Sequence, residues 1–305
     1  MSRKVKRKAS KRVSALFIIV AIISLVVALY PNAIDFFKSL SDQPRKPTVA
    51  DGELSVHFLD VDQGDSILVI APDGSSMLID TSVSKQDDVI IEYLRACGIE
   101  KLDYLVLTHP DADHIGSATS ILKAVGAETV YMTDMTHTTK TFETLLNTID
   151  ELDITMKIPK LNEEIKLGDA IFTVLGPVNK TDNKNEMSIV LRLDYGNHSF
   201  MLTGDAGHDS EKDMLSEHSK SAFKADVLKL GHHGSSTSSS REFVLAVDPD
   251  YAIISCGRDN SYGHPHSETM ELLRELDIPY YITYEIGNII FVSDGTTLTV
   301  QRPSA

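Results

Sequence analysis

Two histidines and two aspartates lie within six consecutive positions, 109 to 114, of the segment Thr108-His-Pro-Asp-Ala-Asp-His-Ile-Gly116. Imidazole nitrogens and carboxylate oxygens bind divalent metal ions such as zinc and manganese. A solvated acidic turn is the simpler interpretation, but the chain has only 11 histidines in 305 residues, and two of them flank this Asp-x-Asp pair. The segment therefore predicts a metal-binding loop that contains His109, Asp111, Asp113 and His114.

Three later clusters carry the same residue types: Asp205, the pair His232 and His233, and the pair His264 and His266. Asp205 follows the apolar run 199–203, and the first histidine pair follows the run 225–230. In a layered α/β fold, the ends of neighbouring strands meet at one edge of a sheet. We therefore expect these side chains to join the 109–114 loop around a single site.

The elements that would position this site alternate between strands and helices. Leu102–Leu107 predicts a buried strand that delivers the loop, and residues 115–125 predict a helix that leaves it. Strands are also expected at 53–61, 66–71 and 76–80 as a β-meander, and at 130–132, 170–175, 188–193, 199–203, 225–230, 251–255, 280–284, 288–292 and 297–301. Further helices are expected at 86–97, 141–152, 210–218 and 267–276.

The first 52 residues differ from the rest of the chain. Residues 1–12 carry seven Lys and Arg residues and no acidic residue, and residues 13–30 are uncharged and mostly apolar. A helix of 18 residues is about 27 Å long, close to the thickness of a bilayer core. We predict a basic cytoplasmic leader at 1–12, one transmembrane helix at 13–30, a stalk at 31–52 and an extracellular domain at 53–305, because basic flanks stay in the cytoplasm. A cleaved signal peptide is the alternative, but bulky residues follow Ala28 where cleavage would occur.

The domain that follows this leader is strongly acidic. Seven of the 29 Lys and Arg residues lie in the leader, which leaves 22 against 44 acidic residues, a formal charge of −22. This balance argues against passive docking on long nucleic acids, although bound cations would reverse the charge locally. The two cysteines, Cys97 and Cys256, fit neither a zinc-finger spacing nor a disulfide framework, and we interpret them as buried thiols.

Several motifs, in this order, resemble the metallo-β-lactamase-fold domain of the ComEC-type late competence proteins. They are Phe58-Leu-Asp-Val-Asp-Gln-Gly-Asp-Ser66, Leu78-Ile-Asp-Thr81, the loop at 109–114, Asn185-Glu-Met-Ser188, Thr203-Gly-Asp205, Leu228-Lys-Leu-Gly-His-His-Gly-Ser235 and Asn260-Ser-Tyr-Gly-His-Pro-His266. The resemblance runs from about Glu53 to Pro303. It implies an α/β fold, the αββα sandwich, with a binuclear metal site along one edge of the sheets.

The resemblance also implies a set of ligands. His109 and Asp111 would hold one ion, Asp113 and His114 the other, Asp205 would bridge both, His233 would complete the first site and His264 the second. Which member of each histidine pair binds metal stays open, and the unused His232 or His266 would contact the substrate phosphate or the leaving group. Asp113, Asp205 and His232 are the predicted catalytic residues. Asp80 and Asp60 end apolar strands and could orient the histidines, although Asp60 could equally cap a turn.

Departures from the broader fold family affect the metal. Asp111 stands where many of these hydrolases have histidine, and the segment 185–188 lacks a histidine to act as a middle ligand. The site is therefore rich in oxygen donors, which favours manganese as well as zinc. Asp62 and Ser82 replace glycines of the ComEC-type pattern, and this affects turn geometry rather than the number of ligands.

These features predict a membrane-anchored, extracytoplasmic hydrolase with two divalent metal ions, zinc or manganese. Two such ions lower the pKa of a bridging water, so a hydroxide can attack a phosphodiester. The resemblance suggests single-stranded DNA as the substrate and DNA uptake in competence as the process. Only one apolar span is present in this sequence, so DNA transport would require a separate membrane channel as partner.

Two alternatives remain open at this point. The acidic domain favours a phosphodiesterase that acts on cell-envelope polymers or choline-phosphate-type groups. The missing middle histidine favours a metal-binding module without catalytic activity. The sequence alone does not distinguish between these hypotheses.

Overall fold

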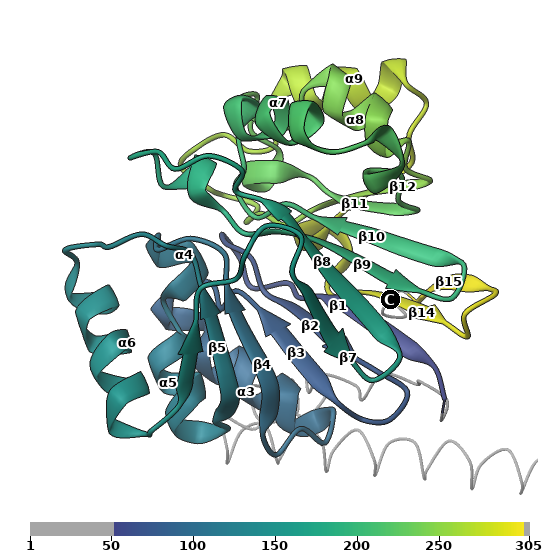
Figure 1. Ribbon diagram of the computed structural model, residues 1–305. Coiled ribbons are helices and arrows are strands. Elements are labelled where there is room, and N and C mark those ends of the chain that lie inside the picture. Colours follow the sequence, from purple (N-terminus) through teal and green to yellow (C-terminus); the bar gives the residue numbers. More distant parts are fainter. Residues whose placement is uncertain (1–51, 302–305) are drawn as a thin grey trace, which may run out of the picture. The chain divides into compact units, whose positions relative to one another are not determined.

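The computed structural model describes residues 52–301 (Figure 1). The predicted leader at 1–12, the predicted transmembrane helix at 13–30 and almost all of the predicted stalk lie outside this range. Between residues 52 and 301, none of the helices is both long enough and apolar enough to cross a bilayer.

Fifteen strands in the described range form two sheets. The first sheet contains β1 (Leu54–Phe58), β2 (Ile67–Ile70), β3 (Ser76–Ile79), β4 (Leu102–Leu107), β5 (Ala127–Met132), β6 (Thr155–Lys157), β14 (Ile289–Ser293) and β15 (Leu298–Gln301), in the order β15-β14-β1-β2-β3-β4-β5-β6. The second contains β7 (Glu164–Leu167), β8 (Ala170–Gly176), β9 (Val190–Tyr195), β10 (His198–Leu202), β11 (Val227–Lys229), β12 (Tyr251–Ile254) and β13 (Tyr280–Ile282), in the order β13-β12-β11-β10-β9-β8-β7.

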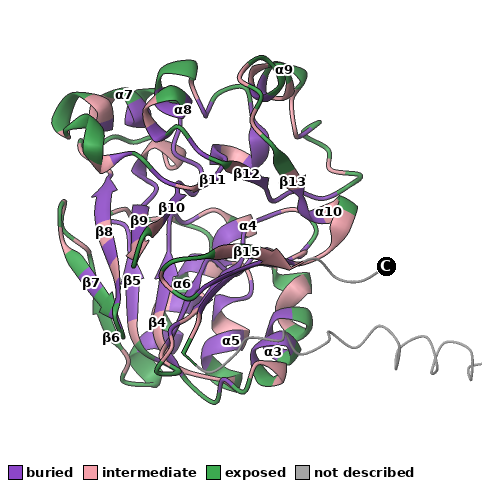
Figure 2. Ribbon diagram, turned by 90° about the vertical axis from the view of Figure 1, so that its right-hand side faces the viewer, coloured by how far each residue is buried: buried purple, intermediate pink, exposed green. Residues whose placement is uncertain are grey.

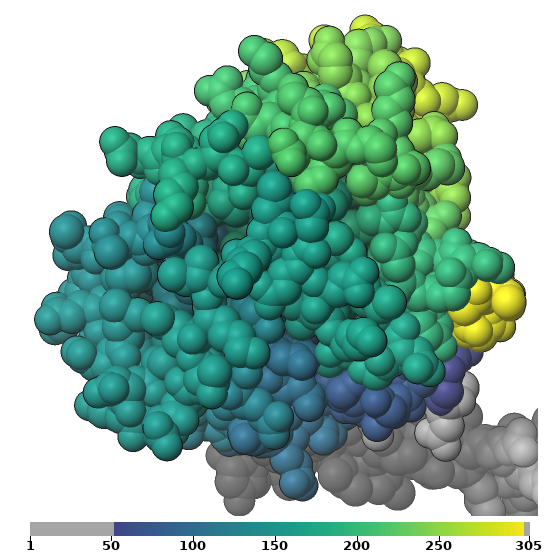
Figure 3. Space-filling view, viewed as in Figure 1, coloured from purple at the N-terminus to yellow at the C-terminus, as the bar shows by residue number. Residues whose placement is uncertain are grey.

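Helices cover the outer face of each sheet. They are α3 (Asp87–Ala96), α4 (Ala112–Ile115), α5 (Ala118–Ala124) and α6 (Lys140–Glu151) in the first half, and α7 (His208–Glu217), α8 (Arg241–Val247), α9 (Ser267–Glu275) and α10 (Thr283–Ile286) in the second. In Figure 1 the layers follow one another as helices, sheet, sheet and helices. The first half of the described chain forms the lower part of the molecule and most of the second half the upper part, whereas β14 and β15 return to the first sheet (Figure 3).

Three apolar clusters hold the layers together. One lies between the sheets and includes Phe58, Phe172 and Phe291, and the other two lie between each sheet and its helices. Figure 2 shows buried residues on the strands and on the inner helix faces, with exposed residues on the outer helix faces. This is the burial expected for amphipathic helices that pack on sheets. The structure therefore confirms the predicted αββα sandwich.

Two local predictions need correction. The predicted helix at 115–125 is divided, because α4 begins inside the metal loop at Ala112 and α5 starts at Ala118. The predicted strand at 280–284 ends at Ile282, and the helical turn α10 follows it. The predicted β-meander is confirmed, since β1, β2 and β3 pair as antiparallel neighbours.

Candidate metal centre

The candidate site lies where the carboxyl ends of parallel strands from both sheets meet. Strands β3 and β4 are parallel in the first sheet, and β10, β11 and β12 are parallel in the second. The loop after β4 carries the 109–114 cluster, Asp205 follows β10, and His232 and His233 follow β11. This edge is the usual ligand-binding position in α/β sheets. The structure thus brings together residues from sequence segments about a hundred positions apart.

Asp205 is the buried carboxylate at the centre of the cluster. Its Oδ1 atom lies 3.2 Å from His114 Nε2 and 3.6 Å from His233 Nε2, whereas its Oδ2 atom lies 3.7 Å from both His109 Nε2 and His232 Nε2. The left-handed Gly204 (φ +53°) precedes it, and a Cβ atom at this glycine would meet the Thr108 side chain at 3.0 Å. Each oxygen of Asp205 therefore faces a different group of imidazoles.

His114 is held by hydrogen bonds on the side away from the cluster. Its Nδ1–H donates to Asp80 Oδ2 at 2.8 Å, and Asp80 also accepts hydrogen bonds from the backbone N–H and the hydroxyl of Thr108. A carboxylate partner of this kind fixes the tautomer of a metal-binding histidine and leaves the Nε2 lone pair free. The interpretation of Asp80 as an orienting residue agrees with this geometry.

His233 owes its direction to an unusual backbone. Both His232 (φ 49°) and His233 (φ 57°) adopt left-handed conformations, in a turn that begins at Gly231 and ends at Gly234. His233 Nδ1–H donates to the carbonyl oxygen of Ser255 at 2.9 Å, and its Nε2 lies 3.4 Å from Asp113 Oδ2. Non-glycine residues in this conformation cost about 1–3 kcal/mol each and concentrate at functional sites.

The distances correct one expected grouping. We expected His233 to complete the site of His109 and Asp111, but its Nε2 gathers with Asp113 and His114, and these ligand atoms lie within 4.8 Å of one another. The physical reason is the left-handed turn, which directs the ring towards Asp113, where Ser255 holds it. His232 instead lies near Asp205 Oδ2, the oxygen that also faces His109. It is at the rim of the site, and 27% of its side chain is exposed.

His109 occupies the other side of the cluster. Its Nε2 lies 3.9 Å from Asp111 Oδ2, and its Nδ1 lies 3.2 Å from the Thr108 hydroxyl and 3.3 Å from the Ser188 hydroxyl. The Ser188 hydroxyl also accepts a hydrogen bond from the backbone N–H of Asp205. Ser188, in the segment that lacks a middle histidine ligand, therefore connects His109 with the backbone of Asp205.

The histidine pair after β12 divides into two roles. His264 is buried, its Nδ1 has no hydrogen-bond partner among the described residues, and its ring centroid lies 5.3 Å from that of His232. His266 Nδ1 accepts a hydrogen bond from the backbone N–H of Ser236, and its Nε2–H donates to the carbonyl oxygen of Tyr262. Of the two, only His264 keeps a free nitrogen beside the cluster.

The donor atoms at the centre fit a divalent cation. Buried atoms without a hydrogen-bond partner in the described part of the chain include the Nε2 atoms of His109, His114 and His233 and the Oδ1 atom of Asp205. Buried polar atoms are nearly always paired, so four convergent exceptions indicate a ligand. Divalent metal ions bound at this cluster would satisfy these atoms.

The ionisation of the cluster supports this interpretation. Burial lowers the pKa of His109 to about 3, so this imidazole is neutral and its Nε2 lone pair is available. Burial also opposes charge on His233, but the nearby Asp205 and Asp65 carboxylates raise its pKa to about 9. The carboxylates thus favour positive charge at the cluster. Protons on the imidazoles can supply this charge, and a bound divalent ion would replace them.

Three residues near the site were not predicted from the sequence. Lys184, which precedes the 3-10 turn η2 (Asn185–Met187), forms an ion pair with Asp111. Asp65 and Lys229 are both completely buried and form an ion pair behind His233. Asp65 and Lys229 lie in two of the motifs quoted above, so the sequence could have indicated them. Lys184 lies in none of these motifs.

The remaining expectations concern residues outside the centre. Burial raises the pKa of the Asp60 carboxyl, and the nearby backbone of Asp62 partly offsets this rise, which agrees with the alternative that Asp60 caps a turn. His57, in β1, is buried, and its ring nitrogens form hydrogen bonds with the hydroxyls of Tyr93 and Ser55. Cys97 and Cys256 form no disulfide within the described residues; Cys256 is buried as predicted, whereas Cys97 is only partly buried.

The fold and this site define a class of protein. A model of the metallo-β-lactamase superfamily matches residues 59–258, and the chain belongs to this superfamily of metal-dependent hydrolases. Membership implies binding of divalent metal, for which the His/Asp cluster is the candidate site.

Within this class, the chain is related to the ComEC-type competence proteins, as the motifs indicated. It is 34% identical to ComE operon protein 3 of Bacillus subtilis over 255 residues, which cover 78% of this chain and 33% of that protein. It is 30% identical to competence protein ComA of Neisseria gonorrhoeae over 268 residues, which cover 85% of this chain and 35% of that protein. The chain thus spans about a third of the length of these relatives.

Solved structures share the fold at low sequence identity. The metallo-β-lactamase fold protein YhfI of Bacillus subtilis is 14% identical with a TM-score of 0.55, and covers 79% of this chain and 100% of its own. The metallo hydrolase Igni18 of Ignicoccus hospitalis is 15% identical with a TM-score of 0.51, and covers 78% of this chain and 98% of its own. These similarities concern the fold alone.

Proposed function

We propose that this protein is a binuclear metal-dependent phosphodiesterase of nuclease type. The observation that carries the proposal is the position of Asp205, whose two carboxylate oxygens face two different groups of imidazoles. A carboxylate that bridges two cations has this arrangement, and two-metal sites are characteristic of phosphodiester hydrolysis.

The chain supplies two unequal sets of ligands. Asp113, His114 and His233 would hold one ion together with Asp205 Oδ1, and His109 and Asp111 would hold the other together with Asp205 Oδ2. Zinc and manganese both suit this mixture of nitrogen and oxygen donors. When bound, the ions supply Lewis acidity and a water of lowered pKa. His264, with its free Nδ1, would support the set that contains His233.

His232 would act on the substrate. It lies at the rim, its Nε2 is 3.7 Å from Asp205 Oδ2, and the Asn185 amide nitrogen lies 3.4 Å from the ring nitrogens. This position suits an imidazole that hydrogen-bonds the substrate phosphate or stabilises the leaving oxygen. The other two predicted catalytic residues, Asp113 and Asp205, would act by holding the metal ions.

The cellular setting follows from the leader sequence. Residues 13–30 would anchor the chain in the membrane as a single-pass helix with the N-terminus in the cytoplasm and the hydrolase domain outside. Relatives named as competence proteins favour single-stranded DNA as the substrate, delivered to or from a separate membrane channel.

The test compares two substrates on one preparation. The full chain, purified in detergent and loaded with manganese or zinc, is expected to hydrolyse single-stranded DNA and a small aryl phosphodiester. Asp113→Ala should abolish both activities, whereas Lys224→Gln, which alters an exposed ion pair with Asp248, should abolish neither.

A specific observation favours a second candidate function. Ser188 lies in the segment where a middle ligand is missing, and Lys184 neutralises Asp111, so the chain could bind one ion without turnover. Protein that contains metal but hydrolyses neither substrate would support this binding module and exclude the phosphodiesterase.

A further inference from the structure

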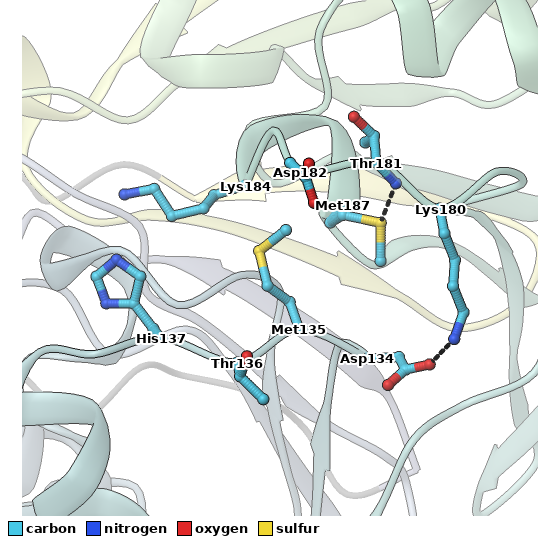
Figure 4. A pocket seen from close by; sticks show the side chains of 9 residues that line it. All are labelled: Asp134, Met135, Thr136, His137, Lys180, Thr181, Asp182, Lys184 and Met187. Carbon is cyan, nitrogen blue, oxygen red and sulfur yellow. Dashed lines mark hydrogen bonds and ion pairs between the residues drawn. The ribbon is translucent and has the colours of Figure 1, made fainter.

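A cavity of about 570 Å³ is lined in part by Lys184, the residue that pairs with Asp111. It is bordered by the segment that follows β5 and by the segment that precedes η2 (Figure 4). Its volume lies within the range of small-molecule sites, roughly 300–1,000 Å³. None of the residues that line it has a role in the metal centre described above except Lys184.

Lys184 connects this cavity with the metal centre. Its ammonium group pairs with Asp111 Oδ1, while Asp111 Oδ2 lies 3.9 Å from His109 Nε2. Lysine binds phosphate as a flexible point charge. An ion that binds at Asp111 would compete with Lys184, and a released ammonium group would lie beside the substrate phosphate.

The middle of the cavity is suited to a flat organic group. Met135 and Met187 lie between the polar ends of the cavity in Figure 4. The backbone N–H of Thr181 donates to the Met187 sulfur, which helps to hold that side chain in place. Thioethers make favourable contacts with aromatic rings, worth about 0.3–1.5 kcal/mol each.

Both lysines of the cavity are paired with carboxylates, Lys180 with Asp134 (Figure 4) and Lys184 with Asp111. Of these two carboxylates, Asp111 also lies beside His109 in the candidate metal centre, so an ion bound there would release Lys184 but not Lys180. His137 also lines the cavity, and its Nδ1 forms a hydrogen bond of 2.9 Å with the Thr139 hydroxyl, which orients the ring. The cavity therefore combines a lysine that can reach a phosphate group with a middle lined by methionines, and the Asp182 carboxylate also lines it (Figure 4).

We propose that this cavity binds the organic group on one side of the reacting phosphate, a nucleoside or a similar aromatic alcohol, and that Lys184 leaves Asp111 to bind a non-bridging phosphate oxygen. The inference rests on the proposed phosphodiesterase function and gives it a substrate class. It predicts that the chain distinguishes phosphodiesters by their alcohol group.

The experiment uses three esters with the same p-nitrophenolate leaving group. They are the thymidine 5′-ester, the methyl ester and the choline ester of p-nitrophenyl phosphate. The metal-loaded full chain should show a kcat/KM at least about tenfold higher for the thymidine ester than for the methyl ester, since several contacts of the above size would add up. Met135→Ala should lower kcat/KM for the thymidine ester severalfold more than kcat/KM for the methyl ester.

Lys184→Gln tests the phosphate contact. A hydrogen bond to a charged group corresponds to about 10–100-fold in affinity, so this variant should raise KM by that factor for all three esters. Lys224→Gln is the matched control, because it removes the same charge from an exposed Lys–Asp pair outside the site. Equal parameters for Lys184→Gln and the wild type would overturn the role of Lys184.

A binding measurement separates this inference from the proposed function. Calorimetry with thymidine 5′-phosphate should give weaker binding for Lys184→Gln and for Met135→Ala than for the wild type, at equal protein-bound metal. If the wild type holds metal, binds the nucleotide in this way and hydrolyses no ester, the proposed function fails and the cavity assignment stands. If thymidine and methyl esters react equally, or the choline ester reacts best, the cavity assignment fails.

Discussion

The ammonium group of Lys229 lies 2.8 Å from the carboxylate of Asp65, and both side chains are buried, with exposures of 0% and 1%. Lys229 Nζ also donates to the carbonyl oxygen of Leu230, and Asp65 Oδ1 lies 3.3 Å from His233 Nδ1. Lys229 is the last residue of β11, whereas Asp65 precedes β2. The pair therefore joins the two sheets directly behind His233.

This buried pair predicts a strong effect on stability. Removal of one partner leaves an uncompensated buried charge, which costs about 3–5 kcal/mol. Lys229→Met should therefore lower the free energy of unfolding by that amount, as measured by urea denaturation of the full chain. The double variant Lys229→Met/Asp65→Leu should recover part of the loss. Equal stability of the single variant and the wild type would show that the pair is not ionised or is not needed.

Asp205 should control the content of both ions. Asp205→Ala removes the carboxylate that faces both groups of imidazoles, so we expect less than one tightly bound ion per chain by elemental analysis. Asp111→Asn should lower the metal content by at most one ion per chain, because the Oδ1 atom of Asp111 is already paired with Lys184. Two ions in the Asp205→Ala variant would contradict the proposed bridge.

The two histidines at 264 and 266 should respond differently to substitution. His266→Ala loses hydrogen bonds to Ser236 and Tyr262, each worth about 0.5–1.5 kcal/mol, and should lower the melting temperature. His264→Ala removes the free nitrogen near the centre, and should lower metal affinity or kcat with a smaller change in melting temperature. The reverse pattern would assign the ligand role to His266.

His57 should contribute a pH-dependent term to stability. Its imidazole is buried between Tyr93 and Ser55, and burial lowers its pKa from 6.5 to about 3 in the folded state. Because the folded pKa is depressed, this stabilisation is present above pH 6.5 and is lost as the pH falls towards 3.

The measurement for His57 is a difference between two proteins. The free energy of unfolding of the wild type minus that of His57→Gln should fall by about 2–3 kcal/mol between pH 7 and pH 4.5, since one pKa unit corresponds to about 1.4 kcal/mol. Any pH dependence that comes from the metal centre is common to both proteins and cancels in this difference. A difference that does not change with pH would mean that His57 is not held neutral by burial.

The sequence by itself determined what is local in this protein. Four residues of metal-binding type within six positions predict a metal loop, and the apolar run Leu102–Leu107 places that loop at a strand end. Alternation and helical spacing predicted most of the strands and helices, because side-chain periodicity directly reflects which face is buried. Ordered motifs along the chain indicated the family.

Only the tertiary structure decided which side chains face the centre and in which group. His232 and His233 are adjacent in sequence, yet the left-handed turn directs one to the rim and the other to Asp113, and backbone dihedral angles are not encoded in residue spacing. Lys184 and Asp111 are 73 positions apart and meet because loops from different sheets converge. Such contacts depend on how two sheets pack, which no single segment of the sequence specifies.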